Sequence, residues 1–188
     1  MATAQISLEP MFKYLSLGMV FSGVLQLAGF VSPGWSRYKY EANDYSYHTG
    51  LWYTVTCTNT CETMSIFRGF EGDYHPYRPW QIQTSIALLA CFIAVIYLIK
   101  ARNLTSARMV KWVTIGAYFS LLSGILSLVP AGIFADSQRS SGSLQFLFPY
   151  SLFLTGLGGS LALIISLISL CFVLSKQTSE PGFQLSSL

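Results

Sequence analysis

Four uninterrupted stretches without a charged residue constrain the fold of this 188-residue chain more than any other feature. They run from Tyr14 to Ser36, Pro79 to Ile99, Trp112 to Ala135 and Ser140 to Ser175. Each is longer than the roughly 20 residues that a helix needs to cross the hydrocarbon core of a bilayer. Because no water is present there to bind backbone amides, the spans must be helices. The pattern predicts a small polytopic membrane protein.

Composition agrees with this interpretation. Charged residues make up 10% of the chain, against roughly 25% in a typical globular protein. So few charges cannot build a water-soluble surface, which excludes a cytosolic enzyme, a nucleic-acid binder and a disordered chain. The net charge of +3 is then a signal of membrane topology, and we expect no nucleic-acid partner.

The distribution of cations predicts the orientation. With a cytoplasmic N-terminus, the inner segments hold six cations and two acids, whereas the outer segments hold five cations and six acids. The loop from Lys100 to Lys111 has four cations and no acid, which the positive-inside rule places in the cytoplasm. We therefore expect a multi-pass protein of the plasma membrane with both termini in the cytoplasm. A cleavable signal peptide is the alternative for the first stretch.

The whole chain, residues 1–188, then forms a single four-span membrane domain. The spans lie near residues 14–31, 80–99, 112–134 and 149–174. The first extracellular loop is 32–79, the second is 135–148, and the cytoplasmic tail is 175–188. Small residues at four-residue spacing in the third span, Gly116, Ser120 and Gly124, predict close helix packing or a dimer face, and Gln26 predicts a hydrogen bond between helices.

Catalysis is not expected. None of the four predicted spans has an ionisable side chain of the kind that pumps and proton-coupled transporters need. The two histidines, His48 and His75, lie in the first outer loop, where no catalytic triad or metal-ligand spacing can be composed from them. We therefore expect a protein that is not an enzyme and has no metal or other cofactor.

The first outer loop has the composition of a β-sheet. Residues 35–40, 51–57 and 61–67 alternate aromatic or β-branched residues with polar ones, as strands do. Three residues separate Cys57 from Cys61, and a hairpin loop of that length would bring the two cysteines opposite each other. We expect a disulfide between them in an oxidising compartment, with two free thiols as the alternative. Cys171, near the cytoplasmic end of the fourth span, is a candidate for palmitoylation.

These features together resemble the superfamily of claudins, peripheral myelin protein and epithelial membrane proteins, and most of all a divergent or invertebrate claudin-like protein. The resemblance covers most of the chain in architecture, but few positions carry it in sequence: Trp35, Gly50, Leu51, Trp52, Cys57, Cys61 and Arg78. It departs from the claudin pattern in having four residues between Trp52 and Cys57 and three between the cysteines.

The resemblance implies an all-α, left-handed four-helix membrane bundle that bears a small extracellular antiparallel sheet, stapled by the disulfide. It also implies cell–cell adhesion, or a paracellular barrier or channel at a cell junction such as the tight junction, built by self-association through the sheet. An auxiliary subunit that modulates an ion channel or receptor is the alternative.

Each position of the signature has a physical role that we can predict. Trp35, Leu51 and Trp52 would hold the foot of the sheet against the bundle. Gly50 would allow a close backbone approach or a positive φ. Arg78 would donate to strand carbonyls or to a loop acid.

The C-terminus adds a candidate cytoplasmic partner. Ser186 and Leu188 match the ligand of a class I PDZ scaffold, although such short matches often arise by chance.

Overall fold

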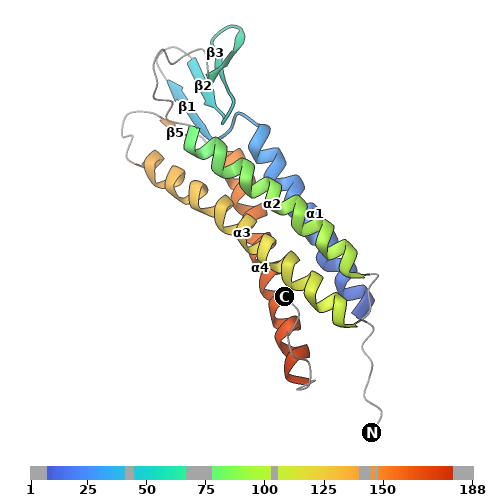
Figure 1. Ribbon diagram of the computed structural model, residues 1–188. Coiled ribbons are helices and arrows are strands. Elements are labelled where there is room, and N and C mark those ends of the chain that lie inside the picture. Colours follow the sequence, from blue (N-terminus) through green and yellow to red (C-terminus); the bar gives the residue numbers. More distant parts are fainter. Residues whose placement is uncertain are drawn as a thin grey trace.

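The computed structural model describes residues 8–40, 45–66, 78–102, 106–139, 145–146 and 148–179. Its four long helices are α1 (Leu8–Val31), α2 (Arg78–Arg102), α3 (Ser106–Arg139) and α4 (Tyr150–Ser179). Each contains a segment long and apolar enough to cross a membrane. The helices pack in a ring, in which α1 contacts α2 and α4, and α3 contacts the same two helices (Figure 1). This confirms the predicted four-helix bundle.

The helices extend beyond the predicted spans. The third helix was expected near residues 112–134, but α3 begins at Ser106 and ends at Arg139, inside the predicted second loop. A charge-free stretch marks only the part of a helix that can lie in hydrocarbon. The helix itself can continue into water, because its backbone hydrogen bonds also form between charged residues. Pro130 lies inside α3, as is tolerated in bundles where neighbouring helices satisfy the freed carbonyl.

A five-stranded antiparallel sheet lies at one end of the bundle (Figure 1). Its strands are β1 (Ser36–Tyr40), β2 (Tyr45–Thr49), β3 (Tyr53–Cys57), β4 (Cys61–Ser65) and β5 (Gln145–Phe146), in the spatial order β4-β3-β2-β1-β5. Three of these strands fall within the predicted segments. The second, β2, and the two-residue β5 were not predicted. Pairing of β1 with β5 joins the two loops into one sheet.

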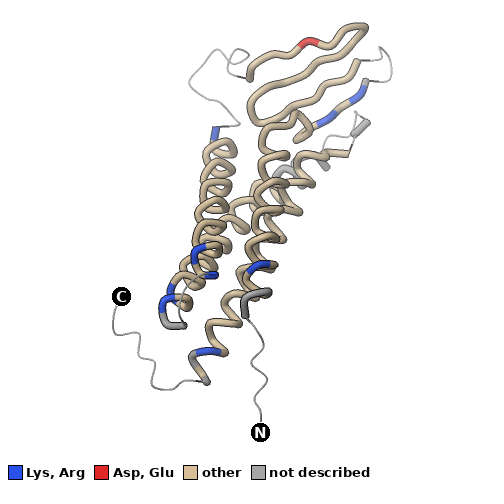
Figure 2. Tube along the Cα trace, turned by 90° about the vertical axis from the view of Figure 1, so that its right-hand side faces the viewer, with Lys and Arg blue, Asp and Glu red and all other residues tan. Residues whose placement is uncertain are grey.

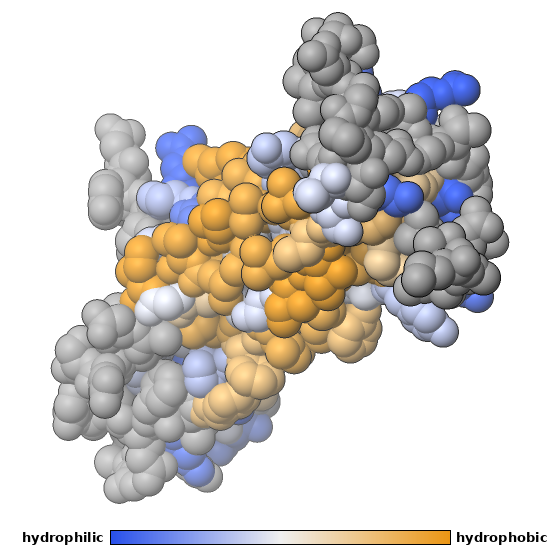
Figure 3. All heavy atoms as spheres, turned by 90° about the horizontal axis from the view of Figure 1, so that it is seen from below, coloured by the Kyte–Doolittle hydropathy of each residue, from blue (hydrophilic) through white to orange (hydrophobic). Residues whose placement is uncertain are grey.

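Charged and apolar residues occupy different parts of the helical bundle. Most of the described lysine and arginine residues on the helices lie toward the end opposite the sheet (Figure 2). Between that end and the sheet, the helix surface is covered with exposed apolar side chains, seen from the end opposite the sheet in Figure 3. This arrangement suits a bundle whose middle faces hydrocarbon and whose ends face headgroups and water.

A buried polar network holds three of the helices together. The Gln26 side chain on α1 donates to Ser123 Oγ on α3 at 3.1 Å, and its Oε1 accepts from Ser127 Oγ at 2.9 Å. Ser22 Oγ, also on α1, donates to the Gly158 carbonyl of α4 at 2.7 Å. The predicted interhelical hydrogen bond of Gln26 is therefore confirmed. Such bonds favour association of helices where no hydrophobic effect drives it.

Glycines on α3 and α4 allow close packing between helices of the bundle. A Cβ added to Gly124 on α3 would lie 2.9 Å from the Gly159 carbonyl oxygen of α4. One added to Gly158 on α4 would lie 2.9 Å from the Ser22 carbonyl oxygen of α1. Real Cβ atoms do not approach backbone so closely, so these glycines allow the helix axes to come together. For the predicted stripe of Gly116, Ser120 and Gly124, the contact of Gly124 supports packing within the bundle over a dimer face.

Candidate functional site

The most highly constrained region is the junction where the sheet meets the bundle. Trp35, which joins α1 to β1, is completely buried. Its indole Nε1–H donates to the Gly29 carbonyl of α1 at 2.8 Å, and its backbone amide donates to the Thr49 carbonyl of β2 at 3.0 Å. One residue thus connects the last turn of the first helix with the second strand. Its indole is enclosed by protein and is not placed among lipid headgroups.

The start of α4 closes the same junction from the other side. Ser151 Oγ accepts from the Gly34 amide at 2.8 Å and shares a hydrogen bond of 2.6 Å with Ser32 Oγ. The Ser151 amide in turn donates to the Gly34 carbonyl at 3.3 Å. Gly34 leaves room for this contact, because a Cβ here would lie 2.5 Å from the Tyr150 ring and 2.7 Å from Ser151 Oγ, and both side chains would have to move. These bonds join residues more than a hundred positions apart in the chain.

The Gly50-Leu51-Trp52 segment is the tight connection between β2 and β3, not the start of a strand as predicted. The Gly50 amide donates to the Tyr53 carbonyl at 2.9 Å and closes the turn. A Cβ on Gly50 would lie 2.8 Å from the Ser32 carbonyl oxygen, so close approach, not a positive φ, explains this glycine. The turn places the side chains of Leu51 and Trp52 in the junction.

A small apolar cluster fills the junction beneath the sheet. Leu51 is fully buried there and Trp52 is half-buried, with its ring 5.0 Å from that of Phe30 in an edge-to-face contact. The cluster is drawn from the first loop and from all four helices: Trp35, Leu51, Ala131 and Leu152, with Phe30, Trp52 and Trp80 packed against them. Three of the predicted signature residues therefore meet in one cluster.

Gln81, which the sequence analysis did not single out, connects α2 to this cluster. Its Nε2 donates to the Leu51 carbonyl at 2.6 Å, and its side chain is buried. Arg78, predicted for a related role, begins α2 with an exposed side chain. The adjoining residues 67–77 lie outside the described residues, so the partner of Arg78 stays a prediction. The sequence did contain a signal for this contact, because a glutamine one turn after the start of an apolar helix needs a hydrogen-bonding partner.

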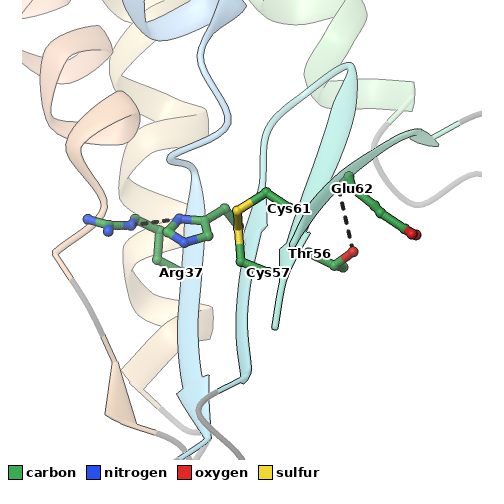
Figure 4. The surroundings of a disulfide bond; sticks show 6 residues. Arg37, Thr56, Cys57, Cys61 and Glu62 are labelled. Atoms are coloured by element: carbon green, nitrogen blue, oxygen red, sulfur yellow. Dashed lines mark hydrogen bonds between the residues drawn. A yellow bond between two sulfur atoms is a disulfide. The ribbon is translucent and has the colours of Figure 1, made fainter. Parts of the chain in front are cut away.

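The disulfide pins the far end of the sheet. Cys57 and Cys61 are paired across β3 and β4, with their Cα atoms 4.1 Å apart and a sulfur–sulfur bond of 2.04 Å (Figure 4). The predicted bridge across a three-residue hairpin loop is confirmed. It covalently connects the outermost strand to its neighbour at the end remote from the bundle.

The outermost strand, β4, is the exposed edge of the sheet. All five of its residues are exposed. The Ile66 amide, just after β4, donates to the Trp52 carbonyl at 3.2 Å. Because hydrogen-bonded and non-bonded pairs alternate in antiparallel ladders, Met64 and Glu62 also face β3. The backbone groups of Cys61, Thr63 and Ser65 therefore point away from the sheet.

A cationic contact connects the sheet to the second loop. Arg37 Nε on β1 donates to His48 Nδ1 on β2 at 2.9 Å (Figure 4). The same guanidinium donates to the Phe148 carbonyl at 3.4 Å and lies 5.4 Å from the centre of the Tyr150 ring. Arg37 thus bridges two strands and the start of α4.

This contact predicts a loss of stability in acid. Burial, and then the positive charge of Arg37, lower the pKa of His48 from its ordinary value of 6.5. The unfolded chain therefore binds a proton at higher pH than the folded chain. We expect the thermal midpoint to be constant above the ordinary pKa, and to fall as the pH drops from there toward the lowered value.

The His48→Gln variant should lose this pH dependence, because glutamine does not titrate but can accept the Arg37 hydrogen bond. Melting curves of purified protein between pH 7.5 and pH 5, in roughly half-unit steps, measure the effect over the range in which histidine titrates. The His75→Gln variant is the matched control and should keep the dependence. An identical pH profile in the wild type and His48→Gln would contradict the assignment.

The remaining predicted sites are at the opposite end or beyond the described residues. Cys171 is an exposed free cysteine on α4, and its palmitoylation stays a prediction. Ser186, Leu188 and His75 lie outside the described residues. Within the described ranges, no three metal-ligating side chains lie close enough together to hold a metal ion.

Comparison with known protein families finds no family that matches the chain. A search of curated proteins likewise finds no match.

Proposed function

We propose that the protein is a claudin-like membrane component of cell junctions, which self-associates through its sheet to form an adhesive or paracellular barrier structure. The observation that carries this proposal is the exposed edge strand β4, held on a disulfide-pinned sheet. An open strand edge offers amides and carbonyls to a second chain, and β-strand addition is a common mode of protein recognition.

The rigidity of the sheet supports this role. The disulfide holds one end of β4, and the buried junction around Trp35 and Leu51 holds the sheet on the bundle. A strand that is already ordered loses little conformational entropy when a partner pairs with it. Tethering in a membrane also gives every copy the same orientation, which favours lateral contacts between identical edges.

Pairing of two copies through β4 would be symmetric about its central residue. Two antiparallel β4 strands related by a twofold axis through Thr63 would use the outward backbone groups of Cys61, Thr63 and Ser65. The side chain of Thr63 is exposed, and its amide faces away from β3. Thr63 is therefore the position at which a change can remove an outward donor without breaking a ladder bond inside the chain.

The Thr63→Pro variant should weaken self-association roughly 10- to 30-fold, because a symmetric pair would lose two backbone hydrogen bonds. Proline is tolerated in edge strands when its missing donor faces outward. Energy transfer between fluorescently tagged copies in cells that lack junctions measures the association. Thr63→Ala, which keeps the outward amide, is the matched control and should associate as the wild type does.

Freeze-fracture images and transepithelial resistance of the same cells test the barrier role. We expect continuous strands and raised resistance for the wild type and Thr63→Ala, and neither for Thr63→Pro. If the wild type stayed as diffuse monomers and the transepithelial resistance did not change, the proposal would be wrong. If the protein instead co-purifies with a channel or receptor and changes its gating, the alternative role as an auxiliary subunit replaces it.

A further inference from the structure

The end of the bundle opposite the sheet carries a concentrated positive surface. Lys100 and Arg102 end α2, and Arg108 and Lys111 lie in the first turns of α3, all with exposed side chains. We call these four residues the α2–α3 basic corner (Figure 2). Residues 100–111 contain no aspartate or glutamate. The two helices pack against each other, so these positive charges gather at one end of the α2–α3 hairpin.

Aromatic side chains pack directly against this corner. The Lys100 ammonium lies 5.5 Å from the centre of the Trp112 ring. Trp112 stacks on Tyr97 at 5.1 Å, and Tyr97 lies parallel to Phe119 at 6.1 Å. Tryptophan and tyrosine concentrate at the level of lipid headgroups. In a bilayer, the contact with Trp112 would therefore hold the charge of Lys100 at that level.

Apolar side chains continue directly from the basic corner toward the middle of the bundle. Ile96 and Ile99 on α2 are 51% and 48% exposed. Residues one turn apart on a helix share a face, so Ile96 lies one turn below Lys100, and Ile99 lies one turn below Arg102. A molecule with an anionic head and an apolar tail could contact both kinds of surface at once.

We propose that the α2–α3 basic corner binds the phosphate-bearing headgroup of an anionic phospholipid, whose acyl chains lie against Ile96 and Ile99. Arginine and lysine are the usual donors to phosphate oxygens. Four neighbouring cations favour a headgroup with several phosphates over one with a single negative charge, because each cation near a charged membrane surface adds to the attraction. This inference does not depend on the proposed junctional function.

Native mass spectrometry of the full-length protein in detergent tests the proposal. The probes are phosphatidylinositol bisphosphate, phosphatidylserine, phosphatidylcholine and free inositol trisphosphate. We expect the bisphosphate lipid to bind most tightly, and the free inositol phosphate to bind more weakly than the lipid. Lys100→Gln with Lys111→Gln should weaken binding of the bisphosphate lipid roughly 10- to 30-fold.

The matched control removes two cations from the other two helices at the same end of the molecule. Lys13→Gln with Lys176→Gln should change the affinity by less than about threefold. If the first pair of substitutions impairs folding, the single exposed change Lys111→Gln should still weaken binding roughly fivefold. Equal binding of phosphatidylcholine, equal losses in the two double variants, or equal binding of free inositol trisphosphate would each overturn the proposal.

Discussion

Replacing Trp35 with alanine should lower the free energy of unfolding by about 3–5 kcal/mol, the usual cost of removing a fully buried tryptophan. The Trp35 side chain is 0% exposed and forms the centre of the junction cluster with Leu51. Its loss also leaves the Gly29 carbonyl without the indole donor. The sheet should then separate from the bundle more often. Thermal unfolding in detergent measures the stability, and limited proteolysis of the sheet measures the opening.

Two control variants separate the role of Trp35 from a general effect of losing an aromatic ring. Phe21→Ala removes a side chain that is 57% exposed on the helix surface, and should change stability by less than about 1 kcal/mol. Trp35→Phe keeps much of the packing but loses the hydrogen bond to Gly29, and should cost about 1–3 kcal/mol. If Trp35→Ala were no more harmful than Phe21→Ala, the junction would not be what secures the sheet.

Replacing Gly158 with leucine should destabilise the bundle by about 3 kcal/mol, at the upper end of the range for overpacked sites. A Cβ at Gly158 would already lie 2.8 Å from Gln26 Cγ and 2.9 Å from the Ser22 carbonyl oxygen. Separating α1 from α4 to make room would also break the hydrogen bond from Ser22 Oγ to the Gly158 carbonyl. Thermal unfolding in detergent measures the loss.

The matched control is Gly132→Leu, at an exposed glycine of α3. A Cβ at Gly132 would meet nothing within 4 Å among the described residues. The added side chain should be neutral or slightly stabilising, because leucine favours the helix over glycine by up to about 1 kcal/mol. Equal losses at the two positions would show that the contact of Gly158 with α1 is not tight.

Local patterns predicted most of the elements. The four helices follow from charge-free stretches, since hydrocarbon excludes charge and demands satisfied backbone bonds. The Cys57–Cys61 bridge followed from the number of residues between the cysteines. β2 was not predicted, although Tyr45, Tyr47 and Thr49 alternate with Ser46 and His48, and this alternation is the local signal of a strand.

Other features had no local signal. β5 has only two residues, Gln145 and Phe146, and is a strand only because β1 supplies its hydrogen-bonding partners. Likewise, the sequence indicated that Gln26 needs a polar partner, but not that Ser123 and Ser127 of α3 supply it. A polar side chain in an apolar helix predicts that a hydrogen bond exists, whereas its partner depends on how the helices are rotated about their axes.

The sequence by itself determined which segments form helices long and apolar enough to cross a membrane and which cysteines pair, because these depend on hydrophobicity and on short-range chain geometry. Only the tertiary structure decided how the sheet is held on the bundle. Ser32 and Ser151 share a hydrogen bond across 119 positions, and Gln81 reaches Leu51 across 30. Such contacts depend on which helices pack together at their small residues. No local sequence pattern specifies that arrangement.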